Sequence, residues 1–402
     1  MTYARAGWPA IVLASLVVGA CGGGEEPSGE SQPSATKGLV EAPKVAMKRE
    51  LGTGEGKLSI VAWAGYAEDG STDPKVDWVT PFEEKTGCQV SVKVGNTSDE
   101  MVTLMRSGQY DGVSASGDAT LRLIAGGDVA PVNTKLVPNY ADVFDGLKDQ
   151  RFNSVNGQMY GIPHGRGANL LMWRSDEIEE ELDSWSAVWE DGKQHKGKVT
   201  AYDSPIYIAD AALYLRTTRP ELKIESPYAL DQKQFDAAVE LLKQQRPNIG
   251  EYWSDYTKEQ AAFASGDSHV GTTWQVIANL LEADDVPVKT TLPKEGSTGW
   301  SDTWMVAAKA KHPNCMYLWM DHIISPDANA QVAEWFGEAP ANRESCARTA
   351  AKDHCETFHA DDQTYFDRVQ FWTTPTRNCG DERGAVCVDY SEWTKAWTEI
   401  KG

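Results

Sequence analysis

Strand-like and helix-like segments alternate in the first half of this chain, and their order constrains its fold more than any other feature. Three segments have the apolar or alternating pattern of strands, and two amphipathic segments between them have the pattern of helices. In chain order they are residues 58–63, 77–87, 90–94, 97–105 and 111–115. Gly87 ends the first helix, and a capping box from Thr97 to Glu100 opens the second. This order predicts a parallel α/β sheet, whose ligands gather at the carboxyl ends of its strands.

A second set of α/β elements follows residues 160–163. Its predicted strands and helices lie at residues 198–202, 235–245, 270–274, 315–324 and 390–400. The sequence shows no internal repeat and no coiled-coil pattern. At 402 residues the chain is long enough for about two domains, each with its own core.

The charge of the chain limits what it can bind. The formal net charge is -21 at pH 7, and such a surface repels phosphates instead of releasing their counterions. We therefore expect no nucleic acid among the partners, whereas a cationic ligand is compatible with this charge. The chain also has 15 tryptophans, and tryptophan is common both in pocket walls and in cores.

The first 21 residues resemble a bacterial lipoprotein signal. Arg5 precedes an apolar run at residues 11–18, which is too short to span a bilayer as a stable helix. Gly19 and Ala20 then lead to Cys21. The resemblance implies that residues 1–20 are removed and that Cys21 is lipidated. The exported protein would then be anchored to the outer face of the cytoplasmic membrane or lie in the periplasm, and no later segment is apolar enough to cross a membrane.

Residues 21–56 are expected to be a disordered tether. They are rich in Gly, Glu, Ser and Pro and poor in aromatic residues. Such a composition cannot bury enough apolar surface to fold. A flexible tether of this length lets the folded part move roughly 30 Å from the lipid.

Six cysteines remain after Cys21, and an even number in an exported protein suggests disulfides. We favour the short-loop pairings Cys346–Cys355 and Cys379–Cys387, which leaves Cys88–Cys315 by subtraction. Cysteine spacing alone leaves the other connectivities open.

Residues 299–304 place two tryptophans around a carboxylate, after a turn at residues 294–297 and before an apolar run at residues 305–308. This pattern predicts a strand with Trp300 and Asp302 on one face, because side chains two apart in a strand point the same way. An indole ring attracts positive charge and a carboxylate supplies a counter-ion, so the pair suits an organic cation. The alternative is a core tryptophan next to an exposed aspartate.

No motif for catalysis or for metal or nucleotide binding is complete. Residues 112–116 almost form the turn that presents a nucleophilic serine, but a serine replaces the final glycine. Residues 354–362 gather metal-ligand types without the paired-histidine spacing of a zinc protease, and Cys355 is expected in a disulfide. There is no phosphate-binding loop and no dinucleotide fingerprint. We therefore expect no enzyme, no bound metal and no cofactor.

The expected lipid anchor, the tether and the two α/β sets together resemble a solute-binding lipoprotein of an ABC importer. Over residues 57–402 the chain resembles, more narrowly, the spermidine/putrescine-binding family. The matching motifs lie at residues 62–66, 82–87, 110–113, 160–163, 292–296, 300–302 and 325–333. The most specific piece is Leu-Pro-Lys-Glu-Gly at residues 292–296, followed by Trp-Ser-Asp at residues 300–302.

The resemblance implies an α/β fold of the type II periplasmic-binding-protein class. This fold is a two-lobed clamp in which each lobe is a mostly parallel sheet flanked by helices, with the ligand in the cleft between the lobes. Lobe 1 would comprise residues 57–167 and 303–344, and lobe 2 would comprise residues 168–302 and 345–402. The chain would cross the hinge more than once.

By the positions of the family's motifs, both lobes would contribute to the ligand site. Asp302 would hold an ammonium group, while Trp274 and Trp300 would enclose the methylene groups of the ligand. The full set of expected binding residues is Trp63, Tyr66, Ser116, Asp118, Asp203, Trp274, Trp300 and Asp302.

Departures from the family leave the ligand open. The polyamine-binding proteins carry acidic residues where this chain has Gly65 and Ile206, and Asp118 could restore one charge. Arg166 falls near the crossover, where it could meet a ligand carboxylate or form an ion pair between the lobes. With Asp302 on the other side, Arg166 would suit a zwitterion such as an ω-amino acid.

The sequence therefore predicts the extracytoplasmic substrate-binding component of an ABC importer, which captures a polyamine-like cation of the putrescine/spermidine class and delivers it to the permease. One alternative is the same scaffold binding a zwitterion. Another is a surface sensor that passes closure of the lobes to a membrane kinase. The resemblance implies a monomer that meets the membrane only through its lipid anchor.

Overall fold

The computed structural model describes residues 39–402. Cys21 and the expected signal peptide lie outside the described residues, so their processing stays a prediction. Within residues 39–402, no helix is both long enough and apolar enough to cross a membrane.

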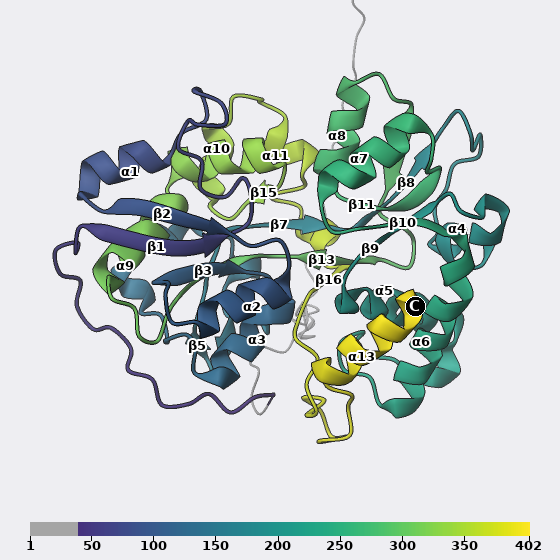
Figure 1. The fold of residues 1–402 in the computed structure, drawn as a ribbon, viewed down its shortest axis with the longest axis horizontal. Coiled ribbons are helices and arrows are strands. Elements are labelled where there is room, and N and C mark those ends of the chain that lie inside the picture. The colour runs from purple at the N-terminus through teal and green to yellow at the C-terminus, as the bar shows by residue number, and fades with distance from the viewer. Residues whose placement is uncertain (1–38) are drawn as a thin grey trace, which may run out of the picture. The chain divides into compact units, whose positions relative to one another are not determined.

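Two five-stranded sheets organise this part of the chain (Figure 1). In each, three parallel strands pair at one edge with two strands that run antiparallel to their neighbours. The first sheet has the order β2 (Gln89–Val94), β1 (Lys57–Ala62), β3 (Gly112–Ala115), β14 (Thr303–Val306), β6 (Ile162–Pro163). The second has the order β10 (Ile249–Trp253), β9 (Val199–Tyr202), β11 (Val270–Thr273), β8 (Leu170–Arg174), β12 (Val288–Thr291).

A smaller sheet connects the two, and Figure 1 shows its strands β7 and β13 between the larger sheets. Its order is β15 (Ala339–Pro340), β7 (Gly165–Ala168), β13 (Ser297–Trp300), β16 (Val369–Phe371), and β4 (Ser154–Val155) pairs separately with β5 (Gln158–Met159). β7 follows β6 of the first sheet and leads into β8 of the second, while β13 leads into β14. Residues 162–168 and 297–306 therefore run antiparallel between the sheets, and we call them the crossover ribbon.

The prediction of one strand through Trp300 and Asp302 is wrong. β13 ends at Trp300 and β14 begins three residues later, because the chain leaves the smaller sheet there and enters the first sheet. The neighbouring strand holds this break: Ser301 Oγ donates a hydrogen bond to the carbonyl oxygen of Gly165 at 2.9 Å, and the amide of His164 donates to the carbonyl oxygen of Asp302 at 2.8 Å. Asp302 thus lies at the junction between two sheets.

Helices pack against both large sheets. Those associated with the first sheet are α1 (Val79–Thr86), α2 (Ser98–Arg106), α3 (Gly117–Gly126), α9 (Pro313–Ile323) and α10 (Pro326–Phe336). Those associated with the second are α4 (Ser186–Trp189), α5 (Ile208–Thr218), α6 (Gln232–Gln245), α7 (Tyr256–Ser265), α8 (Gln275–Ala283) and α13 (Tyr390–Lys401). Two short helices, α11 (His354–Thr357) and α12 (Gln363–Phe366), precede β16. The 3-10 helices are η1 (Thr134–Leu136), η2 (Pro138–Asp142), η3 (Asp145–Leu147), η4 (Asp191–His195), η5 (Pro205–Tyr207), η6 (Pro220–Leu222), η7 (Arg246–Asn248) and η8 (Arg343–Ala347).

The glycine end of α1 is confirmed, and the capping box predicted at the start of α2 forms in part. Gly87 adopts the left-handed conformation after α1, with φ of 73°, and its amide donates to the carbonyl oxygen of Glu83. At the start of α2 the hydroxyl of Thr97 accepts from the amide of Glu100 at 3.1 Å. The Glu100 carboxylate accepts from the amide of Asn96 and not from that of Thr97, so only half of the capping box forms.

The alternating valines of residues 90–94 do form a strand, β2, but the alternation does not bury one face. Val92 and Val94 are 38% and 39% exposed. β2 is the edge strand of the first sheet, so it pairs only with β1. Helix α1 contacts the start of β2, where the amide of Val90 donates to the carboxylate of Glu83, but Val92 and Val94 stay exposed.

Each large sheet has its own core, and most tryptophans belong to these cores. Trp173, Trp253 and Trp393 are buried in the cluster around the second sheet. Trp304 and Trp319 are buried in the cluster around the first. The sheets follow the expected α/β pattern, whereas the proposed lobe boundaries remain predictions.

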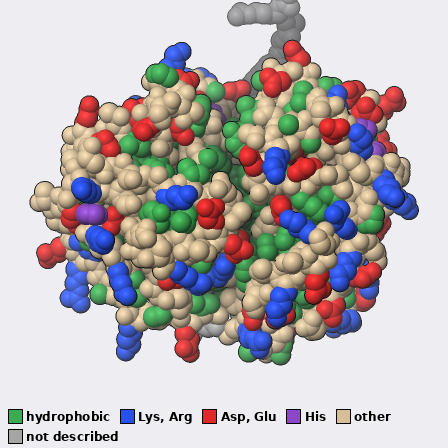
Figure 2. All heavy atoms as spheres, in the orientation of Figure 1, with side chains coloured by type: hydrophobic (Ala, Val, Ile, Leu, Met, Phe, Trp, Pro, Cys, Tyr) green, Lys and Arg blue, Asp and Glu red, His purple; other side chains and the backbone are tan. Residues whose placement is uncertain are grey.

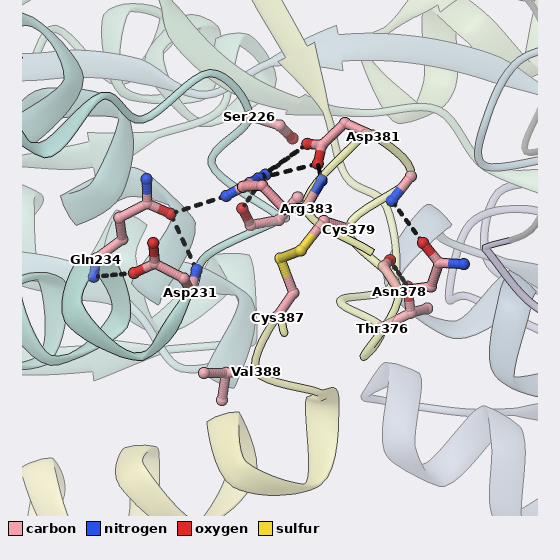
Figure 3. Close-up of a disulfide and its surroundings, with 12 residues drawn as sticks. Ser226, Asp231, Gln234, Thr376, Asn378, Cys379, Asp381, Arg383, Cys387 and Val388 are labelled. Carbon is pink, nitrogen blue, oxygen red and sulfur yellow. Dashed lines mark hydrogen bonds and ion pairs between the residues drawn. A yellow bond between two sulfur atoms is a disulfide. The ribbon is translucent and has the colours of Figure 1, made fainter. Parts of the chain in front are cut away.

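The favoured disulfide pairing is confirmed. Cys88 is bonded to Cys315, Cys346 to Cys355, and Cys379 to Cys387. Figure 3 shows the last bond at the base of a loop whose Arg383 reaches the start of α6. Arg383 Nη1 donates to Gln234 Oε1 at 3.2 Å and Nη2 donates to the carbonyl oxygen of Ala229 at 3.0 Å. These bonds fix the loop against the second sheet's helices.

Residues 39–56, which fall in the expected tether, make specific contacts although they form no helix or strand. Leu39 is buried in a cluster with side chains of α2 and α3. The carboxylate of Glu55 accepts from the amides of Asn314 and Cys315, both at 2.9 Å. These amides lie in the first turn of α9, where a negative charge also interacts favourably with the helix dipole.

We predict that Glu55→Ala lowers the free energy of unfolding by about 1 kcal/mol, because two amides of the first turn of α9 lose their acceptor. Urea unfolding of the full-length chain measures this loss. Glu50→Ala removes an exposed carboxylate five residues earlier and should change stability by less than about 0.5 kcal/mol. Equal effects of the two variants would contradict a capping role for Glu55.

Candidate ligand-binding site

The carboxylate of Asp302 lies at the centre of a buried polar cluster. Only 4% of this residue is exposed. Its Oδ2 accepts from the hydroxyl of Tyr66 at 2.8 Å, and its Oδ1 accepts from the hydroxyl of Ser116 at 2.5 Å. Three residues that are far apart in the chain and were expected to bind ligand are thus brought together.

The topology of the first sheet explains why these side chains meet. Tyr66 follows the carboxyl end of β1, and Ser116 follows the carboxyl end of β3 and caps α3. Parallel strands end at one edge of a sheet, so the loops after β1 and β3 are neighbours there. Asp302 enters the same edge from the crossover ribbon, just before β14 pairs with β3.

Burial makes the charged form of Asp302 costly. It raises the pKa of this carboxyl to about 6, while the hydrogen bonds from Ser116 and Tyr66 act in the opposite direction. The charge of Asp118 adds a smaller upward effect on the pKa. A cation beside Asp302 would remove this cost.

Aromatic rings form a continuous series next to Asp302. Successive ring centroids are 4.6 to 6.0 Å apart, mostly in edge-to-face geometry. The series runs Tyr66, Phe336, Trp300, Trp274, Tyr202, Trp372. The two tryptophans expected to enclose the ligand, Trp274 and Trp300, are therefore neighbours within it.

A glycine on the crossover ribbon allows Trp300 to take this place. The indole ring packs directly on Gly167, where an added Cβ would lie 2.5 Å from a ring carbon. Any larger residue at Gly167 would displace the indole.

A chain of hydrogen bonds leads from Trp274 to a second buried carboxylate. Trp274 Nε1 donates to Asn169 Oδ1 at 2.9 Å, Asn169 Nδ2 donates to Thr298 Oγ1 at 2.6 Å, and Thr298 Oγ1 donates to Asp210 Oδ1 at 2.9 Å. Asp210 is 8% exposed, and burial raises its pKa to about 7. This carboxylate, in the first turn of α5, was not expected from the sequence.

Asp118 is buried in the first turn of α3, where its Oδ1 accepts from the hydroxyl of Ser98 at 2.8 Å. Burial raises its pKa to about 6. Burial also raises the pKa of the Tyr202 hydroxyl, and the charges of Asp118 and Asp302 act in the same direction. Asp118 therefore belongs to the same cluster, although it does not contact Asp302 directly.

Two expected residues lie apart from this cluster. Both carboxylate oxygens of Asp203 accept from Lys401 Nζ at 2.7 Å, and Oδ1 also accepts from Trp397 Nε1 at 3.1 Å. Its charge is thus paired with α13. Trp63 is partly buried between two core clusters, and among residues 39–402 it forms no ring pair with the aromatic series.

Arg166 is buried on the crossover ribbon, next to the aromatic series. Its Nη2 donates to the carbonyl oxygen of Ala360 at 2.9 Å, and its guanidinium carbon lies 3.7 Å from the ring centroid of Phe366. Among the described residues, Nε and Nη1 have no acceptor. Burial lowers the pKa of Arg166 to about 10. Arg166 also lines a small cavity of about 20 Å³ together with Trp274 and Trp300.

Sequence reasoning missed several buried residues of the cluster. They are His164, Tyr202, Asp210, Phe336 and Glu338. For Asp210 a signal existed, since it is a lone carboxylate in the apolar run of residues 208–213. Glu338 stands similarly between a glycine and an Ala-Pro pair. An isolated acid in an apolar segment marks either a surface position or a functional one, and only the fold separates the two.

A large pocket in the described part of the chain does not coincide with this cluster. It has a volume of about 840 Å³, lies between α2, α3 and residues 374–394, and contains none of the expected binding residues. The expected residues instead contact one another, as in the hydrogen bond from Tyr66 to Asp302. Figure 2 shows hydrophobic side chains gathered along the middle of one face, between the regions of the two large sheets. The candidate site is thus defined by the chemistry of the cluster and not by pocket volume.

The metal-ligand types of residues 354–362 do not form a metal centre. Cys355 is in a disulfide, and His354 Nε2 lies 2.8 Å from the carbonyl oxygen of Glu338. No group of three or more His, Cys, Asp or Glu side chains within residues 39–402 is arranged to hold a metal ion.

We predict that Asp302→Asn stabilises the ligand-free protein relative to wild type at neutral pH but not in acid. The folded-state pKa, about 6, exceeds the unfolded value of about 3.9, so wild type loses stability as the pH rises through this interval. Between about pH 4 and about pH 7, the free energy of unfolding of the variant should therefore rise by about 2–3 kcal/mol relative to that of wild type.

Urea unfolding at a series of pH values measures this gain. Asp353→Asn removes an exposed carboxylate and controls for the loss of one negative charge. A difference between Asp302→Asn and wild type that stays constant over this pH range would show that Asp302 does not carry the cost of burial.

Comparison with known proteins places the chain in a family. Residues 77–357 match the family model described as bacterial extracellular solute-binding protein. The spermidine/putrescine-binding periplasmic protein of Escherichia coli is 24% identical over 350 residues, which cover 84% of this chain and 94% of the relative.

Solved structures share the fold at low identity. The spermidine/putrescine ABC transporter substrate-binding protein of Streptococcus pneumoniae superposes with a TM-score of 0.66 at 18% identity, over 86% of this chain and 97% of the other. A GABA receptor superposes with a TM-score of 0.63 at 20% identity, over 86% and 98% of the two chains. These likenesses confirm the two-lobed α/β fold of type II periplasmic binding proteins. The chain therefore belongs to the bacterial extracellular solute-binding proteins, a non-enzymatic family of ABC-transporter components that includes the spermidine/putrescine-binding proteins.

Proposed function

We propose that this protein captures a polyamine-like organic cation and delivers it to the permease of an ABC importer. The observation that carries this proposal is the carboxylate of Asp302, which is 4% exposed and is held by two hydroxyl donors beside a series of aromatic rings. Within the described residues it forms no ion pair with a lysine, arginine or histidine.

A buried carboxylate without a cation lowers the stability of the folded protein, and such a group is retained where function requires it. The hydroxyls of Tyr66 and Ser116 each supply one donor to Asp302, and each of its oxygens can accept a further hydrogen bond. An ammonium group would supply both the donors and the opposite charge. The rings of Trp300 and Trp274 would cover the methylene groups and add a cation–π attraction.

Additional buried carboxylates favour a ligand with more than one positive charge. Asp118 and Asp210 are 1% and 8% exposed, and each accepts one neutral hydroxyl donor. They come from helices that pack against different large sheets, since Asp118 belongs to α3 and Asp210 to α5. A diamine or triamine could place separate ammonium groups near different carboxylates.

The crossover ribbon suits a capture-and-release cycle. Tyr66 and Ser116 come from the first sheet, Tyr202 and Trp274 come from the second, and Asp302 lies on the ribbon between them. A ligand that contacts both sides would shift the equilibrium between open and closed arrangements toward the closed one, and no covalent chemistry is needed. The E. coli relative, which is named for spermidine and putrescine, supports this class of ligand. We extend the proposal to a monomer anchored through lipidated Cys21.

Calorimetric titration of the ligand-free, full-length chain with putrescine and spermidine tests the proposal. We predict that Asp302→Asn lowers the affinity for the tighter-binding of the two polyamines by at least about 30-fold. The reason is that an ammonium group would be left unpaired in a buried site. Asp353→Asn, which alters an exposed carboxylate, should leave the affinity within about threefold. Equal binding by wild type and Asp302→Asn would rule out this site.

A zwitterionic ligand is the second candidate, and it is favoured by one observation. Arg166 is 2% exposed, and two of its nitrogen atoms have no acceptor among the described residues. A ligand carboxylate would satisfy both donors. The likeness to a GABA receptor adds support, because that protein is named for an ω-amino acid.

The same titration with 4-aminobutyrate separates the two candidates. Binding of 4-aminobutyrate that falls by at least about 30-fold in Arg166→Met, but not in Arg216→Met, would favour the zwitterion. Tight binding of putrescine that is unaffected by Arg166→Met would favour the polyamine. Arg216 is a suitable control because it lies on α5, outside the cluster, and its pKa is likewise lowered by burial.

A further inference from the structure

Glu338 is a buried acid beside His164, the residue whose amide donates to the backbone of Asp302, and neither the family motifs nor the sequence pattern indicated it. It lies between the left-handed cap of α10, Gly337, and the start of β15, and it is 0% exposed. Its carboxyl group packs on the backbone of Gly165, where an added Cβ would lie 2.3 Å from the Glu338 Cδ. A glycine at this point of the crossover ribbon therefore makes room for the acid.

The two carboxyl oxygens of Glu338 lack a hydrogen-bond donor among residues 39–402. His164 Nε2 lies 3.4 Å from Oε1 without forming a hydrogen bond. By contrast, Glu259, which is also 0% exposed, accepts from the hydroxyls of Thr200 and Thr273, both at 3.2 Å. Buried carboxyl groups are normally satisfied in this second way.

No cation in the described part of the chain compensates Glu338. His164 Nδ1 accepts from Trp304 Nε1 at 2.9 Å, and burial lowers the pKa of His164 to about 3, so this histidine is neutral at pH 7. Arg166 is paired with Ala339 across β7 and β15, and its guanidinium donates to the carbonyl oxygen of Ala360. Among the described residues, Arg166 forms no hydrogen bond with Glu338.

Glu338 interacts electrostatically with Asp302 and with the hydroxyl of Tyr66, which Asp302 also contacts. Burial raises the pKa of Glu338 well above the usual value, and the charge of Asp302 acts in the same direction. Burial raises the pKa of the Tyr66 hydroxyl well above its usual value, and the charges of Asp302 and Glu338 act in the same direction. Two acids with one shared tyrosine neighbour and no cation between them make a site for a positively charged group.

We propose that Glu338 and Asp302 together bind one cationic head of the ligand, and that Glu338 restricts this head to groups with several N–H donors. The inference rests on the proposed capture of an organic cation and specifies its chemistry. A primary ammonium has three donors and a guanidinium has up to about five, whereas a quaternary ammonium has none. Only the first two can satisfy the free oxygens of Glu338.

Titration of the ligand-free, full-length chain with putrescine, agmatine and hexamethylated putrescine tests the inference. The last probe keeps both charges and the methylene chain but has no N–H donor. Wild type should bind putrescine or agmatine at least about 30-fold more tightly than the hexamethylated probe. Glu338→Gln should lower the affinity for whichever of putrescine and agmatine binds more tightly by about 10- to 100-fold. It should lower the affinity for the hexamethylated probe by less than about threefold.

Two further variants make the experiment interpretable. Glu259→Gln alters an equally buried glutamate whose oxygens are already satisfied, and it should leave all affinities within about threefold. Glu338→Asp keeps the charge and should retain more affinity than Glu338→Gln. Thermal unfolding of each ligand-free variant shows whether it is folded.

The outcomes distinguish this inference from the proposed function. If putrescine binding depends on Asp302 but is unchanged in Glu338→Gln, then Glu338 is only a neutral neighbour of His164 and the inference is wrong, while the proposed function stands. Equal binding of the hexamethylated probe and putrescine by wild type also contradicts the inference. If no cation binds to wild type, both proposals fail.

Discussion

A carboxylate that is buried at a junction between sheets is the constraint on which the rest of the site depends. Asp302 lies where the crossover ribbon leaves the smaller sheet and enters the first one, so backbone pairing cannot place it on a regular strand face. The amide of His164 and the hydroxyls of Tyr66 and Ser116 hold it there. These donors are neutral, so they orient the carboxylate without cancelling its charge. The site therefore keeps an electrostatic preference for a cation that arrives from outside the chain.

The same ribbon links recognition to movement. It carries Asp302 and Trp300, it supports Glu338 through Gly165, and it connects the two large sheets. A ligand that draws Tyr202 and Trp274 of the second sheet toward Asp302 would act directly on the segment that must bend. Glycines at positions 165 and 167 leave room there for the carboxyl group of Glu338 and the indole ring of Trp300. In the proposed function, binding energy and lobe closure would be coupled through this short stretch of backbone.

Much of the fold could be predicted from the sequence because helix ends and strand patterns are local signals. The glycine after α1, the capping threonine of α2 and the short cysteine loops all acted as expected. The strand break at Asp302 could not be predicted, because a change of sheet depends on distant partners such as Gly165. Likewise, Glu338 and Asp210 look like ordinary acids until the fold buries them. Asp203 is the opposite case: it was expected to bind ligand, but its carboxylate pairs with Lys401, which lies at the far end of the chain.

The most direct test of this account is a crystal structure of the protein with bound putrescine. The account predicts an ammonium nitrogen within about 2.7–3.2 Å of an Asp302 carboxylate oxygen, with the methylene chain against Trp300 or Trp274. Such a contact would establish that the buried carboxylate is the recognition element. A ligand that lies elsewhere, for example in the large pocket between α2, α3 and residues 374–394, would contradict the central claim.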